Sequence, residues 1–188
     1  MNIQIIDDAI PKYLQDIYEL YILGNNKEQT TPVSPIIDFK CNYETTGIEK
    51  GKLPLNFAHV LKSDSAISTH LQLFSKIPQL ICQIQHRDLL DILVARIFLI
   101  MPYNTNLTHY APHIDLDIKH TVLLYYVNDA DGDTVFFNND GTIFKSVSPK
   151  KGRVILFDGT LLHGGGVPRK HPRCIINFDL LTREDYES

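Results

Sequence analysis

The sequence predicts a mainly β fold of the α+β class, in which an antiparallel barrel or jelly roll is supported by helices. Three observations predict it. The chain has 188 residues, a length typical of one domain. Before residue 92, apolar residues recur at helical spacing among loops; after it, short β-rich runs alternate with turn residues. We therefore expect a single domain, with residues 1–92 as helix and loop support and residues 93–182 as the jelly-roll core.

The composition excludes several classes of protein. A hydrophobic content of 44% argues against disorder, and the longest apolar run, residues 97–101, is too short to cross a bilayer. The net charge of −4, without any Lys/Arg run, disfavours a nucleic-acid partner. The 3 cysteines have no CxxC spacing, and Asp7 and Asp8 lie where an export signal would be basic and then apolar. We expect a cytoplasmic protein without a membrane partner; the oligomeric state stays open.

The first half is expected to contain helices and loops. Residues 9–23 form the clearest amphipathic helix, with Asp7 or Asp8 as cap and Pro11 in the first turn. Helical spacing returns over residues 63–74 and 78–91, with Pro78 separating the two helices. Between them, residues 24–57 are rich in Gly, Pro and Asn, which predicts loops with one edge strand near 36–43. We expect these loops to shape the entrance of a site.

The second half is expected to be antiparallel sheet. Its β-rich runs are short and separated by Gly, Asp, Asn and Pro, a pattern typical of barrels and jelly rolls. The predicted strands are residues 94–101, 120–128, 134–137, 142–147, 153–157 and 174–181.

Two His-x-Asp pairs are candidate metal ligands. His86 and Asp88 lie in a predicted helix, where residues two apart point about 200° away from each other. His113 and Asp115 lie where a loop enters strand territory, and residues i and i+2 of a strand face the same side. Only the second pair can converge on one ion.

Residues further along the chain support the second pair, His113 and Asp115, as metal ligands. His163 follows the strand 153–157, and Arg173 begins the last strand. Two imidazoles and one carboxylate form a facial triad that suits Fe(II) and leaves adjacent coordination positions open. A 2-oxo acid can chelate there and leave a position for dioxygen, while its far carboxylate needs a fixed cation. The guanidinium of Arg173 can supply that cation.

Several motifs around these residues resemble one family, the Fe(II)/2-oxoglutarate-dependent dioxygenases, and within it the prolyl 4-hydroxylase-like group. The resemblance spans roughly residues 96–179. Its motifs are the loop Tyr103–Tyr110 before His113-x-Asp115, the strand 121–128 with Tyr125-Tyr126, the turn Gly132-Asp133-Thr134-Val135-Phe136, and Pro149-x-x-Gly152-Arg153-x-x-x-Phe157 before His163. Asp133 departs from the family's commoner Gly or Glu. Arg173 departs from the Lys of many collagen-type members.

The resemblance implies a fold, a set of cofactors and a reaction. The fold is a double-stranded β-helix, the cupin-like form of jelly roll. Fe(II) is bound by His113, Asp115 and His163, while Arg173 and Tyr126 bind 2-oxoglutarate and Tyr103 has a pocket role. O2 is the second cosubstrate, and ascorbate is a candidate stimulant. The implied reaction hydroxylates a substrate C–H, with a prolyl or other protein side chain as one substrate class and a small molecule as another, and releases succinate and CO2.

Two alternatives remain open from the residues alone. One is a non-catalytic jelly-roll module that uses the same cleft to bind a ligand. The other is a Zn(II)-dependent hydrolase that uses the same three ligands with a metal-bound water, which leaves Arg173 and Tyr126 without a role. The remaining predicted surface or hydrogen-bonded histidines are His59, His70, His109, His120 and His171.

Overall fold

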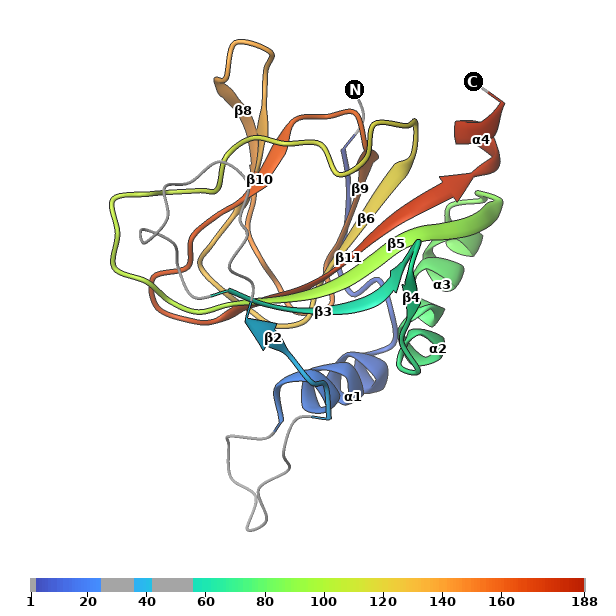
Figure 1. Cartoon of the computed structure of the whole chain (residues 1–188), viewed down its shortest axis with the longest axis horizontal. Coiled ribbons are helices and arrows are strands. Elements are labelled where there is room, and N and C mark those ends of the chain that lie inside the picture. The colour runs from blue at the N-terminus through green and yellow to red at the C-terminus, as the bar shows by residue number, and fades with distance from the viewer. Residues whose placement is uncertain (1–2, 25–35, 42–55, 188) are drawn as a thin grey trace.

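Two antiparallel sheets face each other around a central opening in the ribbon (Figure 1). The structure is a computed structural model that describes residues 3–24, 36–41 and 56–187. The main sheet has the strand order β1-β9-β6-β11-β5-β3-β2, with β4 also paired to β3, and the smaller sheet has the order β10-β7-β8. The main-sheet strands are β1 (Gln4–Ile6), β2 (Lys40–Cys41), β3 (Asn56–Ser63), β4 (Ala66–Ile67), β5 (Leu89–Ile100), β6 (Thr121–Tyr126), β9 (Val154–Asp158) and β11 (Arg173–Thr182). The smaller sheet contains β7 (Thr134–Phe137), β8 (Ile143–Val147) and β10 (His163–Gly165).

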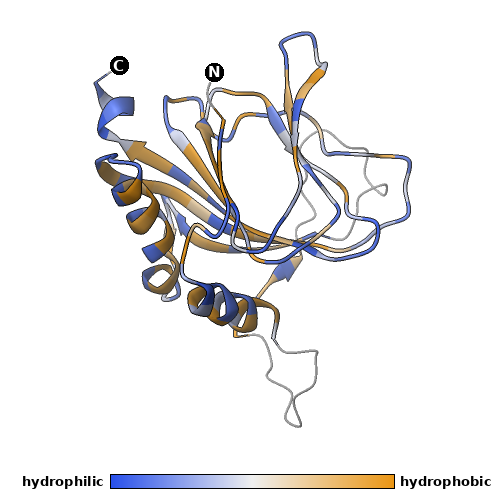
Figure 2. Ribbon diagram, turned by 180° about the vertical axis from the view of Figure 1, so that it is seen from behind, coloured by the Kyte–Doolittle hydropathy of each residue, from blue (hydrophilic) through white to orange (hydrophobic). Residues whose placement is uncertain are grey.

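Three helices lie on the outer side of the main sheet: α1 (Lys12–Leu23), α2 (Leu71–Phe74) and α3 (Lys76–Ile84). A short α4 (Arg183–Tyr186) follows β11. Figure 2 shows that the long strands behind these helices are largely hydrophobic. Tyr18 of α1 and Ile81 of α3 are buried in one cluster with outward side chains of β5, β6 and β11. Among the described residues, no helix has the length and apolar character needed to cross a membrane.

The central strand β6 has a continuously hydrophobic sequence because both of its faces are covered. All its residues are buried, because the helices cover one face and the smaller sheet covers the other. Leu123 and Tyr125 belong to the cluster under the helices, whereas Leu124 and Tyr126 belong to the cluster between the sheets. The space between the two sheets is therefore lined by every second residue of the main-sheet strands.

The strand predictions for the second half are confirmed in position, with the additional strand β10 at His163–Gly165. The edge strand expected near residues 36–43 is β2, and its predicted end at 42–43 lies outside the described residues. The loops expected over 24–57 lie mostly outside them as well. The three cysteines are free, in line with the expectation that they form no disulfide.

The expected cap of the first helix is wrong. Pro11 is the N-cap of α1, and no side chain caps this end. Asp7 instead binds Arg153, with Oδ1 2.6 Å from Nε, and Lys150, with Oδ2 3.1 Å from Nζ. Hydrogen bonds from these two cations lower the pKa of Asp7 to about 2. The carboxylate therefore joins the N-terminal segment to β9 and the turn before it.

The helices expected over residues 63–91 are shorter than predicted, and part of this stretch is sheet. Residues 56–67 form the β3–β4 hairpin, and a register shift between Val60 and Lys62 disturbs the period-two pattern that would have indicated a strand. The helix break is at Ser75, because Pro78 lies in the first turn of α3, where its missing N–H is not needed.

The interpretation of His86 as a helical residue is also wrong. Helix α3 ends at Ile84. Strand β5 begins at Leu89, within residues 1–92, which were expected to form supporting helices and loops. His86 has a φ of 54° in the turn between them, a conformation that ends the helix. The relative orientation of His86 and Asp88 is thus set by a turn and not by helical geometry. Neither residue is in a cluster of potential metal ligands among the described residues.

Tyr18 offers a test of how the helices are attached to the sheet. Its side chain is 1% exposed, its ring lies 5.3 Å from that of Phe74 and 6.3 Å from that of Tyr125, and its hydroxyl donates to the carbonyl of Leu73. We expect Tyr18→Ala to lower the free energy of unfolding by roughly 3–5 kcal/mol in urea denaturation, because a large buried ring leaves a cavity.

The matched control for this experiment is Tyr13→Ala on the same helix. Tyr13 is 63% exposed, so its replacement should change the free energy of unfolding by about 0.5 kcal/mol or less. Equal effects of the two substitutions would contradict the assignment of this α1 face to the core.

Candidate metal and cosubstrate site

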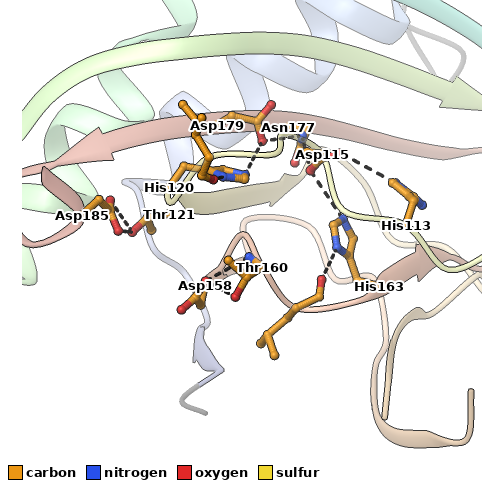
Figure 3. Close-up of polar contacts among 12 residues, drawn as sticks. His113, Asp115, His120, Thr121, Asp158, Thr160, His163, Asn177, Asp179 and Asp185 are labelled. Atoms are coloured by element: carbon orange, nitrogen blue, oxygen red, sulfur yellow. Dashed lines mark hydrogen bonds and ion pairs between the residues drawn. The ribbon is translucent and has the colours of Figure 1, made fainter. Parts of the chain in front are cut away.

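His113 and His163 are held side by side by their own backbones. The N–H of each donates to the carbonyl of the other, at 3.0 Å in both directions, as an isolated antiparallel bridge. Their rings are consequently 4.8 Å apart between centroids. Asp115, two residues after His113, completes a cluster whose potential ligand atoms all lie within 4.8 Å of one another. The structure thus brings the three predicted metal ligands together (Figure 3).

Both imidazoles are oriented by the same local contact. Nδ1 of His113 lies 3.1 Å from the carbonyl of Ala111, and Nδ1 of His163 lies 3.0 Å from the carbonyl of Leu161. A carbonyl only accepts, so each Nδ1 donates to it, and each Nε2 is directed toward Asp115. A backbone partner that fixes the ring in this way is typical of metal-ligating histidines.

Asp115 is positioned as an ionised ligand. Its Oδ2 accepts a hydrogen bond from Nδ2 of Asn177 on β11 at 3.2 Å and lies 3.5 Å from Nε2 of His163. Burial alone would raise the pKa of Asp115, but the hydrogen bond and charge of His163, the charge of His113 and the amide of Asn177 outweigh it. The pKa is held below its usual value, as a carboxylate ligand requires.

A second buried acid lies behind this cluster. Asp179 and His120 are both fully buried, with Oδ1 3.7 Å from Nε2. Asn177 connects the two acids, since its amide also donates to Oδ1 of Asp179 at 3.4 Å (Figure 3). Burial, and next the charge of Asp115, raise the pKa of Asp179 to about 8. The two acids thus differ in the direction of their shifts, because burial and Asp115 raise the pKa of Asp179 whereas the nearby histidines and Asn177 lower that of Asp115.

A cavity of about 790 Å³ extends from the metal cluster between the sheets. Its volume lies in the range of small-molecule sites. His113, Asp115 and His163 line it, and so does Arg173 at the start of β11. The main sheet contributes every second residue of β5 and β11 to this lining: Arg96, Phe98, Ile100, Arg173, Ile175 and Asn177.

Arg173 is a buried cation with unused hydrogen-bonding capacity. It is 1% exposed, and its Nη2 donates to Oγ1 of Thr134 at 2.8 Å. Its Nε has no partner among the described residues, nor does the buried hydroxyl of Tyr110, which lines the same cavity. Buried polar groups without partners are unfavourable, so the end of the cavity near Arg173 is suited to an anionic ligand. A carboxylate would satisfy the guanidinium fork.

The two tyrosines expected at the cosubstrate, Tyr126 and Tyr103, are not among the residues that line the cavity. Tyr126 does not line the cavity; its hydroxyl donates to Oγ1 of Thr134 at 2.7 Å, and its ring lies under the guanidinium of Arg173, 5.7 Å from Cζ to centroid. It therefore orients the groups that line the pocket. Tyr103 is 40% exposed and does not line the cavity either, whereas Tyr110 does.

The glycines after His163 allow two segments to approach closely. A Cβ on Gly166 would lie 2.5 Å from the carbonyl oxygen of Asp133, and a Cβ on Gly132 would lie 2.6 Å from the carbonyl oxygen of Gly166. The N–H of Gly166 donates to the carbonyl of Asp133 at 2.6 Å. Only glycine fits at these positions, and the contact fixes the segment between His163 and Arg173 against the start of β7.

Of the other histidines expected at the surface or in hydrogen bonds, His171 is exposed and His59, His70, His109 and His120 are hydrogen-bonded, but two of them form a second cluster. His59 and His70 lie with Asp38 in a group whose potential ligand atoms are also within 4.8 Å. His59 contacts the carbonyl of Asp38 and the hydroxyl of Ser68, and Nδ1 of His70 contacts the hydroxyl of Tyr21. These partners account for the cluster as a hydrogen-bonded network. Sequence spacing gave no signal for it, because its members come from three separate segments.

Comparisons with known proteins agree with this geometry. Residues 98–178 match the family model described as the 2OG-Fe(II) oxygenase superfamily, a range that contains the triad and Arg173. None of the curated proteins compared with the sequence matches it.

Several solved structures share the fold over nearly the whole chain. A prolyl-4-hydroxylase from Pseudomonas putida is 16% identical, with 95% of this chain and 91% of that chain covered and a TM-score of 0.57. A prolyl hydroxylase from Trichoplax adhaerens, in complex with a hypoxia inducible factor peptide, is 15% identical, with 98% and 84% covered and a TM-score of 0.59. A 2OG-Fe(II) oxygenase family oxidoreductase from Burkholderia pseudomallei is 11% identical, with 95% and 84% covered and a TM-score of 0.64.

The chain thus matches the model of the 2OG-Fe(II) oxygenase superfamily over residues 98–178, less than half of its length. Its fold is the double-stranded β-helix shared by prolyl 4-hydroxylases and other oxygenases of this superfamily, as the sequence motifs predicted.

Asn177 provides a test of the site that does not remove a ligand. Without its amide, Oδ2 of Asp115 loses a hydrogen-bond donor, and we expect Asn177→Ala to weaken Fe(II) or Co(II) binding by roughly 10- to 100-fold in a competition assay with a chelator. Asn138→Ala is the control, because Asn138 is exposed and its side-chain amide donates to Thr142 in the β7–β8 turn, away from the site. Unchanged affinity in a folded Asn177→Ala protein would show that the carboxylate needs no such support.

Proposed function

We propose that the protein is an Fe(II)- and 2-oxoglutarate-dependent hydroxylase. The observation that carries the proposal is one cavity with His113, Asp115 and His163 at one point of its wall and the buried, incompletely paired Arg173 at another. A metal-ligand set alone also fits a zinc hydrolase, and a cavity alone also fits a binding module. The two together fit a metal that chelates a dicarboxylic 2-oxo acid.

The donor set suits Fe(II), since two imidazoles and one carboxylate are donors that this ion accepts while keeping positions for other ligands. Arg173 would bind the far carboxylate of 2-oxoglutarate, with Thr134 orienting the guanidinium at 2.8 Å and Tyr110 adding a hydroxyl. Tyr126 supports this end from behind through its bond to Thr134. When bound, Fe(II), 2-oxoglutarate and O2 supply the oxidising chemistry: one oxygen atom goes to the substrate as hydroxyl and the other to succinate, with loss of CO2.

The protein's own contribution is binding, orientation and exclusion of water. The triad and Arg173 fix the two ends of the cosubstrate, and Ile175, Phe98 and Leu124 provide apolar wall between them. Substrate must enter from the remaining part of the same cavity. The fold likeness to prolyl hydroxylases supports a prolyl or other protein side chain as the first substrate class to test, with small molecules next. Stimulation by ascorbate and a cytoplasmic location stay predictions.

The primary experiment is anaerobic addition of 2-oxoglutarate to the Fe(II)-loaded protein. We expect a visible metal-to-ligand charge-transfer band, followed by succinate release when O2 is admitted. Asp115→Ala should abolish both signals, because the triad loses its anionic ligand. A zinc hydrolase or a non-catalytic module would give no band and no succinate, even with excess iron.

Arg173 can be tested separately from the metal. Arg173→Gln should raise the KM for 2-oxoglutarate by roughly 10- to 100-fold, because hydrogen bonds to a charged group contribute about 1.5–3 kcal/mol. His171→Ala, an exposed histidine near the start of β11, is the control and should leave KM unchanged. An unaltered KM in Arg173→Gln would refute the cosubstrate role of this residue.

A further inference from the structure

A second arginine, Arg96, lines the cavity from the neighbouring strand β5. It is partly buried, and its side chain faces the same space as the triad. Among the described residues, its charge interacts with Asp179, but no hydrogen bond and no ion pair within 4.0 Å occupies any of the five donors of its guanidinium. Partly buried donors without acceptors are unfavourable, so this side chain is suited to a partner that enters the cavity.

The register of the sheet places Arg96 near the metal cluster and away from the cosubstrate arginine. Arg96 is opposite Asn177 of β11, whose amide holds Asp115, whereas Arg173 is opposite Ile100. Arg173 and Asn177 are four residues apart on one strand, which corresponds to about 13 Å along it. The two arginines thus face the cavity from separate positions, one on each side of Ile175 and Phe98.

The other acids of the cavity do not neutralise Arg96. Asp115 belongs to the proposed metal ligands, and Asp38 at the rim is 76% exposed and pairs with His59. Asp179 is the remaining acid near Arg96; it does not line the cavity, and no ion pair within 4.0 Å joins the two. Bound 2-oxoglutarate would place its two negative charges at the metal and at Arg173. Arg96 would keep a positive charge in the part of the cavity left for substrate.

We propose that Arg96 is a specificity-determining residue that binds a carboxylate of the substrate. This inference rests on the proposed function and names its substrate class: a molecule that bears a carboxylate close to the C–H that is hydroxylated. A guanidinium binds a carboxylate through two parallel hydrogen bonds. A phosphate dianion fits less well, because a single arginine would leave one negative charge uncompensated beside Asp115. The carboxylate can belong to a small amino-acid-like substrate or to an acidic residue of a peptide.

Two pairs of probes separate these sources. The first pair is N-acetyl-L-proline and its amide, which differ only in the carboxylate on the ring-bearing residue. The second pair is the blocked dipeptide N-acetyl-Glu-Pro-amide and N-acetyl-Gln-Pro-amide, which differ in an acidic side chain next to proline. Each probe is titrated by calorimetry into wild-type protein loaded anaerobically with Fe(II) and 2-oxoglutarate. We expect the acid of one pair to bind at least about tenfold more tightly than its neutral partner.

The variants identify the residue responsible for this preference. Arg96→Gln should abolish the preference for the acid, and Arg96→Lys should restore part of it, because a single ammonium lacks the two-pronged fork. Lys40→Gln is the matched control: Lys40 also lines the cavity but is exposed at its rim, and its removal should preserve the preference. If Arg96 merely balanced the charge of Asp179, Arg96→Gln would lower stability without changing the ratio of acid to amide affinity.

Three results would overturn the proposal: equal affinities within both pairs, a preference that survives in Arg96→Gln, or failure of both acids to bind the loaded protein. The charge-transfer band is recorded on the same samples before each titration. If the band is absent, the proposed function itself fails. If the band is present and the acid shows no advantage, only the role of Arg96 is refuted.

Discussion

The site depends on the pair of backbone hydrogen bonds that joins His113 to His163. These bonds connect the loop between β5 and β6, two strands of the main sheet, to β10 of the smaller sheet. The metal ligands therefore lie where main-chain hydrogen bonds join this loop to the smaller sheet. The Nδ1 contacts to carbonyls two residues earlier then orient both rings. Main-chain contacts thus place both histidines, the rings of Phe136 and Phe157 lie beside that of His163, and Asn177 holds Asp115.

The main sheet serves two purposes through the alternation of its side chains. Outward residues such as Ile97, Ile176 and Phe178 pack under the helices, whereas inward residues face the cavity. The hydrophobic support of the fold and the polar lining of the site are therefore built by the same strands. A slip of one residue in β11 would bury Arg173 under the helices and expose apolar side chains to the cavity.

The sequence predicts which residues meet at the site better than it predicts their surroundings. His113, Asp115, His163 and Arg173 could be found because their residue types and spacing indicate a metal and a dicarboxylate. Asn177, Tyr110 and Thr134 could not be assigned, because their roles depend on strand register and on which face they present. The helix predicted over 63–74 is limited to α2 at Leu71–Phe74, because the residues before it form the end of β3 and the short β4. β10 was missed because its residues, a histidine and two glycines, have no strand preference.

The two long strands of the cavity wall differ in how freely they can change. β11 contributes Arg173, proposed to bind the cosubstrate, and Asn177, which holds the proposed metal ligand Asp115. Substitutions on its inner face would therefore interfere with the cosubstrate or the metal. β5 lines the same cavity with Arg96 and Phe98 without bonding to any residue of the triad. Under the proposed function, substitutions on β5 would alter the substrate while β11 preserves the reaction. Such an enzyme would acquire new substrates by exchanging side chains on one strand.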